Sequence, residues 1–427
     1  MELDLKKIGI VFGVVVLVLA LGYFIYRAFQ GSAPSGAAGI PSFGTTTGAV
    51  SQVPLGQGGV SAGALPVFTS AGAGAQLPAV FKIADGPVVG AMIIETSRPT
   101  TTVARYVTGG DGHVLDMPLD VPGSVALPVS NTTIPGVEEA VWTESGRGVI
   151  VEYMSDGAVK SAHISLPPVA AQATSSAAAP AVSFLVDNIL SLAASPDGKS
   201  VAYLVRNAEG GADGYLANPD GGNPKKLFSL PLSQFILSWP TAANLFAYTA
   251  SAASVPGVAL TINARTGAAT PTLYGQGLTA LEDPTGAYAL YRTDDGTNAS
   301  AFMMTLSTGA TFVVSYPPSL SAPLPEQCAW GAPHGKNGAR AYCAAAAGGL
   351  PSGFLDYWHR GQASLPNIIA YIDRATNTLV PIATPGTRDG GETSDITNIS
   401  VSPDDRYLSF ISKDDGVLWG VRLSPAP

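Results

Sequence analysis

The chain has 427 residues and a formal net charge of −9, with 22 Lys and Arg against 31 Asp and Glu. This acidic balance argues against nucleic-acid binding, which needs a basic stripe or patch. Charged residues make up only 12% of the chain, whereas about 25% is usual in globular domains. We therefore predict a surface rich in Ser, Thr, Gly and Ala and no nucleic-acid partner.

The first clear segment is an uncharged apolar run from Ile8 to Tyr26, with basic residues on both sides. A helix of about 20 apolar residues spans the hydrocarbon core of a bilayer. A cleaved signal peptide is the alternative, but its apolar region is shorter, about 7–15 residues, and ends at a small-residue cleavage site. We predict a retained transmembrane signal anchor over residues 8–29.

Basic residues set the predicted orientation of this helix. Lys6 and Lys7 precede the apolar run, whereas the next basic residue after Arg27 is Lys82. Positive residues favour the cytoplasmic side of a membrane segment. We predict a single-pass membrane protein with residues 1–7 in the cytoplasm and the folded domain outside it.

A linker is predicted between the helix and the folded domain. Residues 31–80 contain no charge and are rich in Gly, Ala, Ser, Thr and Pro. Such a segment buries too little apolar surface to offset its chain entropy, and about fifty flexible residues reach about 35–40 Å root-mean-square. We predict a flexible tether over residues 30–76 and one folded domain over residues 77–427, in which Val169–Val182 is a low-complexity surface loop.

The folded domain contains a spaced pattern. Pro196, Pro240 and Pro284 occupy the same place in a short motif and lie 44 residues apart. A period of about 40–50 residues is typical of a stacked or radial repeat, most often a β-propeller blade. A pair of β-sandwiches would not explain this spacing. The pattern predicts the architecture and leaves the function open, because propellers host many functions.

One unit of the repeat is readable in residues 190–228. The segment Ser195–Gly198 is a turn in which Pro sets φ at the second position and Gly takes a positive φ. Apolar strands precede and follow this turn, and a second turn, Pro219–Gly222, leads to a last strand that begins at Lys225. Four short antiparallel strands of this kind form one propeller blade.

The order SPDGK-x-VAY followed by PDGGNPKKL, in residues 195–227, resembles the repeat of TolB-type and WD-like propellers. Such propellers are common in bacterial envelope proteins, so the resemblance implies a propeller in the cell envelope. Further units match in outline and begin near Trp142, Trp330 and Val401, and a degenerate unit opens near Val88. We predict an all-β propeller of about seven (six to eight) four-stranded blades.

The two ends of the domain complement each other. After Leu423 the last unit is one strand short, and the segment Leu77–Ile83 lies just before the first unit. Joining both ends in one blade removes exposed sheet edges. We predict that this segment supplies the missing strand and closes the ring.

The chain has two cysteines, Cys328 and Cys343, which flank the turn between two predicted strands of one blade. If the strands pair as a hairpin, the two residues face each other at disulfide distance, and an extracytoplasmic location permits the bond. Two buried free thiols are the alternative. A zinc site is disfavoured, because His334 is the only imidazole nearby and no tetrahedral ligand set is present.

The pattern is least regular between Pro333 and Pro403, where the spacing grows to about 70 residues because of an insertion between Ala346 and Leu365. Inserted loops on a propeller rim often carry binding specificity. Tyr, Trp and Arg also dominate interface energetics. We therefore select four residues as candidate partner contacts: Tyr357, Trp358, His359 and Arg360. The alternative is a loop that folds back over a blade, with its aromatic side chains buried.

No catalytic, cofactor or metal motif is recognisable. The four histidines are scattered, and no G-x-S-x-G element is present. Acidic turns such as Asp294–Gly296 and Asp414–Gly416 have the residues that tight turns require, without the spacing of a calcium loop. We predict no catalytic residue, no cofactor and no metal.

We predict a non-enzymatic, membrane-anchored propeller that binds a protein or polymer of the envelope. The alternative is an extracytoplasmic propeller enzyme, a glycan hydrolase or lyase, with its site in the central funnel. The lining of the funnel discriminates between them. Clustered Asp, Glu, His and Arg would favour the enzyme, and Ser, Ala and Thr would favour the scaffold.

Overall fold

The structure, a computed structural model, describes residues 80–97, 100–121, 124–167, 181–253, 255–295, 299–333, 339–351, 353–385 and 394–423. The predicted cytoplasmic segment 1–7, membrane helix 8–29 and linker 30–76 lie outside these ranges, as does most of Val169–Val182. Within the described ranges, no helix is long and apolar enough to cross a membrane.

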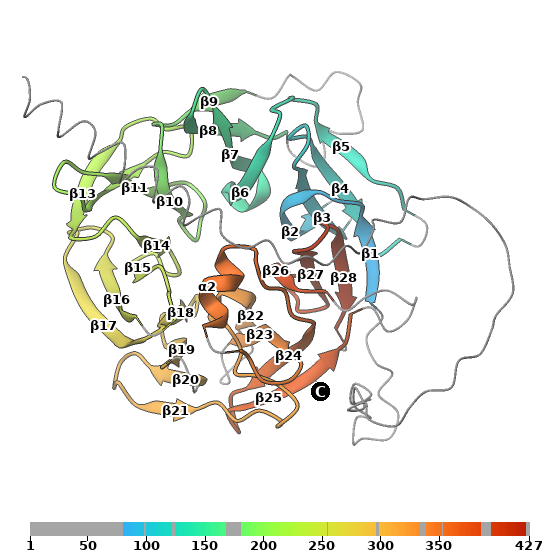
Figure 1. Ribbon diagram of the computed structural model, residues 1–427. Helices are drawn as coiled ribbons and strands as arrows, with labels where there is room; N and C mark the ends of the chain where they lie inside the picture. Colours follow the sequence, from blue (N-terminus) through green and yellow to red (C-terminus); the bar gives the residue numbers. More distant parts are fainter. Residues whose placement is uncertain are drawn as a thin grey trace, which may run out of the picture. The chain divides into compact units, whose positions relative to one another are not determined.

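Seven four-stranded antiparallel sheets surround a common centre (Figure 1). Each sheet is one blade. In six blades the strands follow one another outward in chain order, and in the seventh the outermost strand comes from the start of the domain. The prediction of an all-β propeller of about seven four-stranded blades is confirmed.

The strands are best given by their rank within each blade, from blade 1 to blade 7. The innermost strands are β2 (Val88–Ser97), β6 (Val137–Thr143), β10 (Ile189–Ala194), β14 (Phe235–Ser238), β18 (Thr279–Glu282), β22 (Cys328–Pro333) and β26 (Ile396–Val401). The second strands are β3 (Thr100–Thr108), β7 (Gly148–Ser155), β11 (Val201–Arg206), β15 (Asn244–Thr249), β19 (Tyr288–Asp294), β23 (Ala339–Ala346) and β27 (Tyr407–Ser412).

The third strands are β4 (Val114–Pro118), β8 (Ala158–Ser165), β12 (Ala212–Ala217), β16 (Pro256–Asn263), β20 (Ala299–Thr305), β24 (Asn367–Asp373) and β28 (Leu418–Arg422). The outermost strands are β5 (Leu127–Ser130), β9 (Val182–Phe184), β13 (Lys225–Leu230), β17 (Ala269–Gln276), β21 (Thr311–Val313), β25 (Thr378–Ala383) and, in blade 7, β1 (Val80–Ala84). Short helices include η1 (Glu144–Gly146), η3 (Pro325–Gln327) and α2 (Phe354–His359).

The second strands form the centre of the core, because a neighbouring blade packs on each of their faces. In β7, Val149, Ile150 and Val151 are fully buried. Val149 and Val151 pack with residues of blade 1 such as Val107, whereas Ile150 packs with residues of blade 3 such as Val201. A short continuous apolar run, rich in β-branched residues, is the pattern expected of a strand covered on both faces.

Connections alternate between two rims, because neighbouring strands run antiparallel. The turns that hold Pro196, Pro240 and Pro284 join first to second strands, and we call their common rim the ladder rim. The opposite rim carries the connections between second and third strands and between blades. We call it the insertion rim, because α2 lies there, between β23 and β24.

The ladder turns hold neighbouring blades together. In blade 3, Gly198 adopts the predicted positive φ of 65°. Its carbonyl oxygen accepts a hydrogen bond of 3.0 Å from the backbone nitrogen of Glu144 in blade 2. A Cβ atom on Gly198 would lie 2.0 Å from that nitrogen. The glycine is therefore needed both for the turn and for the close approach of two backbones.

In blade 7, a side chain makes the docking contact with the preceding blade. Asp405 occupies the place of Gly198 and also has a positive φ, of 53°. Its carboxylate accepts hydrogen bonds from the backbone nitrogen of Ala332, at 2.9 Å, and from the hydroxyl of Tyr342, at 3.1 Å, both in blade 6. A polar docking contact replaces the backbone contact made by glycine.

The ring closes through β1, which pairs with β28 so that Val80 opposes Val421. This confirms that the segment before the first unit completes the last blade. The ring of Phe81 lies against Gly420, where a Cβ atom would come within 2.5 Å of it. The edge of Tyr407 packs on the same ring, with centroids 6.4 Å apart.

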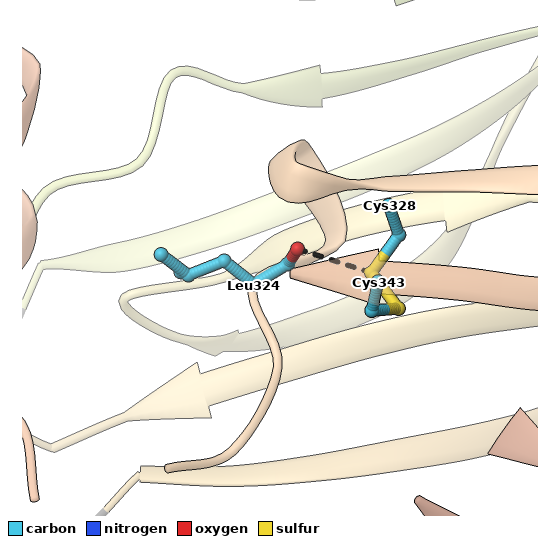
Figure 2. The surroundings of a disulfide bond; sticks show 3 residues. All are labelled: Leu324, Cys328 and Cys343. Atoms are coloured by element: carbon cyan, nitrogen blue, oxygen red, sulfur yellow. Dashed lines mark hydrogen bonds between the residues drawn. A yellow bond between two sulfur atoms is a disulfide. The ribbon is translucent and has the colours of Figure 1, made fainter. Parts of the chain in front are cut away.

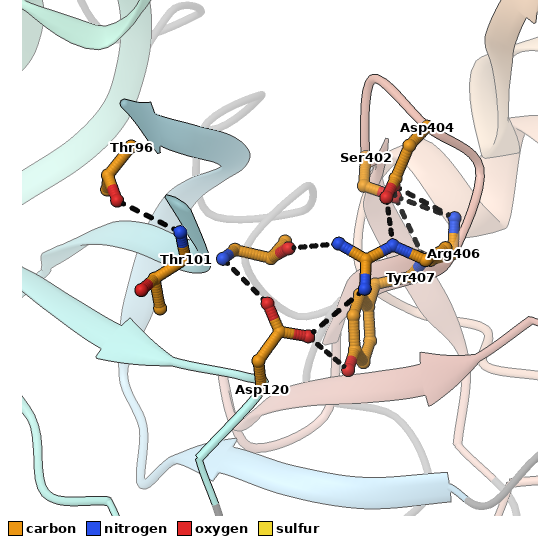
Figure 3. Close-up of polar contacts among 8 residues, drawn as sticks. Thr96, Thr101, Asp120, Ser402, Asp404, Arg406 and Tyr407 are labelled. Atoms are coloured by element: carbon orange, nitrogen blue, oxygen red, sulfur yellow. Dashed lines mark hydrogen bonds and ion pairs between the residues drawn. The ribbon is translucent and has the colours of Figure 1, made fainter. Parts of the chain in front are cut away.

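Polar contacts reinforce this closure on the ladder rim. Figure 3 shows the guanidinium of Arg406, in blade 7, between Asp404 and Asp120 of blade 1. Arg406 also donates to the hydroxyl of Thr102, at 2.9 Å, and the hydroxyl of Tyr407 donates to Asp120, at 2.8 Å. Because the Arg406 side chain is 48% exposed, its ion pairs contribute about 0–1 kcal/mol each, and apolar packing of β1 dominates the closure.

The outermost strands are protected against pairing with other chains. Proline, which cannot donate to a ladder, lies in three of them, at Pro128, Pro271 and Pro381. Lysines lie in β1 and β13, and β9 and β21 have only three residues each. Proline, lysine and short length are common features of edge strands that prevent pairing with another chain.

The docking role of the ladder turn predicts a position-specific effect of alanine. Gly198→Ala should lower the free energy of unfolding by about 3 kcal/mol, because it adds a backbone clash to the strain of a positive φ. Gly210→Ala is the matched control. Its φ is 87° and nothing lies within 4 Å of a Cβ atom there, so about 1 kcal/mol is expected. Urea unfolding of the full-length protein in mild detergent measures both, and equal losses would contradict the docking role.

Candidate functional site

The insertion selected from the sequence forms α2 on the insertion rim, and Figure 1 shows it toward the centre of the ring. Phe354, Leu355 and Trp358 are buried and pack with Leu324. Trp358 is only 6% exposed. This arrangement matches the alternative considered for this segment, a loop that folds back onto the blades, and Trp358 holds the helix in place.

Polar contacts fix the position of Trp358. Its Nε1 donates to Oδ2 of Asp395 at 2.7 Å, and its carbonyl oxygen accepts from Nζ of Lys413 at 2.7 Å. The same Nζ lies 3.9 Å from the centroid of the indole ring and 3.8 Å from Asp395. One tryptophan thereby joins the insertion to two separate segments of blade 7.

The environment of this contact perturbs both charged groups. Burial raises the pKa of Asp395 even though Trp358 and Lys413 stabilise its charged form. Burial also lowers the pKa of Lys413, against the attraction of Asp395. The two groups therefore stabilise each other in a site that disfavours either charge alone.

A second polar group joins the insertion to blades 4 and 6. Nε2 of His359 lies 2.7 Å from Oε2 of Glu326, and the hydroxyl of Ser251 donates to the other oxygen of Glu326 at 3.0 Å. Oδ1 of Asp356 accepts from the backbone nitrogen of Ala253 at 2.9 Å. Because Ser251 bonds to the carboxylate and not to the imidazole, this is not the arrangement of a hydrolytic triad.

The remaining two candidate contact residues face solvent. Tyr357 is 51% exposed, and Arg360, just after the helix, is exposed as well. The four residues selected from the sequence thus divide into two that anchor the insertion, Trp358 and His359, and two that present side chains outside, Tyr357 and Arg360.

Cys328 and Cys343 are brought together directly beneath this region. They are cross-strand partners on β22 and β23, and their sulfur atoms are bonded at 2.09 Å. Figure 2 shows the carbonyl oxygen of Leu324 beside them, 3.2 Å from Sγ of Cys328. A disulfide sulfur has no proton to donate, so this is a close polar contact and not a hydrogen bond. The disulfide joins β22 to β23, the strand after which the insertion begins.

The innermost strands surround the centre of the ring and carry few ionisable side chains. Their only acidic or basic residues are four glutamates, namely Glu95, Glu138, Glu139 and Glu282. The other positions are mostly Val, Ile, Leu, Ala, Ser and Thr. Glutamate is thus the one ionisable residue type on these seven strands.

One carboxylate pair in blade 2 was missed by the sequence analysis. Glu139 on β6 is the direct cross-strand partner of Glu152 on β7. Burial and the charge of Glu139 raise the pKa of Glu152 to about 7, although the hydroxyl of Ser161 donates to it at 3.1 Å. Burial also raises the pKa of Glu139, while part of its side chain still reaches solvent. Counting outward from the turn at Glu144–Arg147 would have revealed the pairing.

No three His, Cys, Asp or Glu side chains of the described residues are placed to hold one ion. In the acidic turn at Asp414–Gly416, Oδ1 of Asp415 accepts from the backbone nitrogen of Val417 at 3.1 Å, and Oδ2 of Asp414 accepts from the hydroxyl of Ser364 at 3.2 Å.

Comparison with known proteins supports the fold. No protein-family model and no curated protein matches the sequence. Solved structures similar to it include an oligogalacturonate lyase in complex with manganese, at 11% identity over 81% of this chain and 93% of that chain, with a TM-score of 0.51.

Two further similar structures are propellers of other kinds. TolB from Acinetobacter baumannii is 12% identical over 79% of this chain and 64% of its own, with a TM-score of 0.37. The β-propeller domain of the Trilobed protease from Pyrococcus furiosus is 11% identical over 68% and 85%, with a TM-score of 0.43. At such identities the likeness concerns the fold alone, and the chain is a seven-bladed β-propeller.

The carboxylate pair predicts a pH dependence of stability. The pKa of Glu152 is raised above its ordinary value of 4.5 to about 7, so between these values the folded state binds more protons than the unfolded state, and stability falls as pH rises. Glu152→Gln should flatten this part of the profile and raise the free energy of unfolding at pH 7.5 by about 1 kcal/mol, allowing for solvent screening. Unfolding curves across this range provide the measurement.

The matched control for this experiment is Glu138→Gln, which changes the exposed neighbour of Glu139 on β6. It should leave the pH profile close to that of the wild type. A Glu152→Gln variant that keeps the wild-type slope, or is less stable at pH 7.5, would refute the proposed repulsion.

The disulfide predicts sensitivity to reductant. Closing a loop with a sequence separation of 15 stabilises a fold by about 3 kcal/mol in the chain-entropy model. Reduction of the full-length protein should therefore lower its unfolding midpoint, whereas the double variant Cys328→Ala/Cys343→Ala should start lower and not respond to reductant. An unchanged wild-type midpoint after reduction, with both thiols then accessible to alkylation, would show that the bond contributes nothing.

Proposed function

We propose that this protein is a membrane-anchored, extracytoplasmic propeller that binds a protein or polymer of the cell envelope through its insertion rim. The membrane anchor and the tether in this proposal rest on the apolar run Ile8–Tyr26 and the uncharged residues 31–80. The observation that carries the binding role is the division of α2 into a buried, anchored face and the exposed pair Tyr357 and Arg360.

The path of the chain supports the choice of rim. β1 begins beside Val421 and ends beside Leu418, so it enters the blade from the ladder rim and ends at the insertion rim. Residues before Val80 therefore join the domain on the ladder rim, the opposite side to α2. A tether attached there leaves the insertion rim accessible to a partner.

The anchoring of α2 supports a role in recognition. Tyr and Arg are enriched among residues that dominate interface energetics. A contact residue on a segment already held in place loses less conformational freedom on binding. Trp358, His359 and Asp356 all contact other segments of the ring, so Tyr357 and Arg360 project from a preorganised support.

An extracytoplasmic glycan hydrolase is the second candidate, and the pair Glu139 and Glu152 is the observation that favours it. The Cβ atoms of directly opposed strand positions lie about 4.5–5.5 Å apart, so the two carboxyl groups can adopt the separation of about 5 Å used by retaining glycosidases, in which a carboxyl group with a raised pKa serves as general acid. Three of the four glutamates on the innermost strands, Glu95, Glu138 and Glu139, are exposed and would repel an acidic glycan when ionised. This disfavours a lyase that acts on polyanions.

The binding proposal predicts the effect of removing the exposed pair. Tyr357→Ala/Arg360→Ala in the full-length chain should reduce recovery of a cross-linked envelope component by about tenfold or more, since two such side chains contribute about 1–2 kcal/mol each. The matched control is Arg265→Ala/Tyr274→Ala, which removes the same residue types. Tyr274 is 69% exposed on an outermost strand, and Arg265 is exposed on the ladder rim.

The outcomes separate the two candidate functions. Equal recovery with both double variants would show that Tyr357 and Arg360 do not form the binding surface. Release of reducing sugar from a neutral glycan by the wild type, abolished in Glu152→Gln, would establish the hydrolase in its place.

A further inference from the structure

The helix α2 depends on its surroundings. It has six residues, and its N-cap, Gly353, offers no side-chain hydrogen bond. An isolated helix of this length is unstable in water. Its structure therefore rests on the packing of Phe354, Leu355 and Trp358 and on the polar contacts to the ring.

These polar contacts reach segments far apart in the sequence. Ala253 belongs to the connection between β15 and β16 in blade 4, Glu326 to η3 at the entrance to blade 6, and Lys413 to the turn between β27 and β28 in blade 7. The insertion continues beyond the helix, where the hydroxyl of Ser364 donates to Asp414, also in blade 7, at 3.2 Å. The insertion thus forms a strap over the insertion rim from blade 4 to blade 7.

One contact of the strap involves a group that titrates near neutral pH. Nε2 of His359 lies 2.7 Å from Glu326, and the two side chains are 32% and 13% exposed. Glu326 is held in place, because Ser251 donates to it and the hydroxyl of Tyr248 bonds to it as well. The carboxylate is thus a fixed acceptor, and the charge of the imidazole decides the strength of the contact.

The charged groups around His359 come from every segment packed on the strap. The hydrogen bond to Glu326 raises the pKa of His359, against burial and the repulsion of Lys413, and Asp356 adds a smaller favourable charge. Asp395 and Asp414 attract the charge of Lys413. Glu326 also attracts the charge of Arg292 on β19. Acidic groups outnumber basic ones around this contact, which favours the charged imidazole.

The direction of the effect follows from linkage. A histidine with a raised pKa stabilises the folded arrangement fully below its ordinary pKa of about 6.5, and the stabilisation is lost as pH rises through the higher folded value. The histidine contact is therefore strongest in mildly acidic solution and weaker in mildly alkaline solution.

We infer that the insertion is a pH-sensitive strap, in which the charged pair His359–Glu326 holds α2 on the ring in mildly acidic solution and releases it more often above neutral pH. Release changes the support beneath Tyr357 and Arg360. The strap thereby regulates the surface assigned to the partner, and only this last consequence rests on the proposed function.

Hydrogen exchange tests the strap without a partner. The full-length protein in lipid nanodiscs is labelled at about pH 6 and about pH 8.5, and the exchange of the amides in α2 is corrected for the chemical effect of pH. Loss of one charge-assisted hydrogen bond should raise the opening equilibrium of α2 by about tenfold at the higher pH. In His359→Gln, which keeps a neutral donor, the opening should be high and equal at both pH values.

A second histidine on the same rim provides the control. His113→Gln changes another rim histidine, whose Nδ1 lies 3.1 Å from Asp111 in blade 1, and should exchange like the wild type. Wild-type protection of α2 that does not change with pH would overturn the strap. So would a pH dependence that persists in His359→Gln, since it would then belong to another group. Because no partner is present, either result leaves the binding experiment with Tyr357 and Arg360 to be judged separately.

Discussion

The structure depends on one backbone constraint, a left-handed residue in the ladder turns of blades 3, 5 and 7 that touches the blade before it. Gly198 docks on the backbone of Glu144, whereas Gly286 lies against the side-chain methyl group of Thr241. Asp405 reaches the preceding blade with its carboxylate. A residue that must both reverse the chain and admit a neighbouring backbone has few chemical solutions. The constraint accounts for the glycine or aspartate at the fourth position of the turns in blades 3, 5 and 7.

Closure and function are connected through the position of β1. Because the first strand of the domain completes the last blade, both ends of the ring lie together and no blade is left with a missing strand. The chain enters from the ladder rim, and the departure from the regular blade, α2, lies on the other rim. In the function proposed above, the tether would join the ladder rim and the partner would bind on the insertion rim.

The sequence identified the segment that forms the candidate site but not the roles of the residues within it. The long interval between Pro333 and Pro403 identified the insertion, because an insertion lengthens one step of a regular spacing. It did not show that Trp358 points inward while Tyr357 points outward. On a six-residue helix that choice is made by partners distant in sequence, among them Asp395 and Lys413, which no local pattern indicates. Glu139 and Glu152 escaped notice because their pairing depends on hairpin register.

The sequence by itself determined the architecture: the 44-residue spacing, the turn chemistry of Ser195–Gly198 and the complementary ends predicted a closed propeller of about seven blades. These signals are local, because a turn needs particular residues and a strand needs apolar runs. Tertiary structure decided which side chains from different blades and loops meet, and how deeply they are buried. The raised pKa of Glu152, the contact of His359 with Glu326 and the burial of Trp358 arise where strands and loops from different places converge, and burial and charge at those points depend on the whole ring.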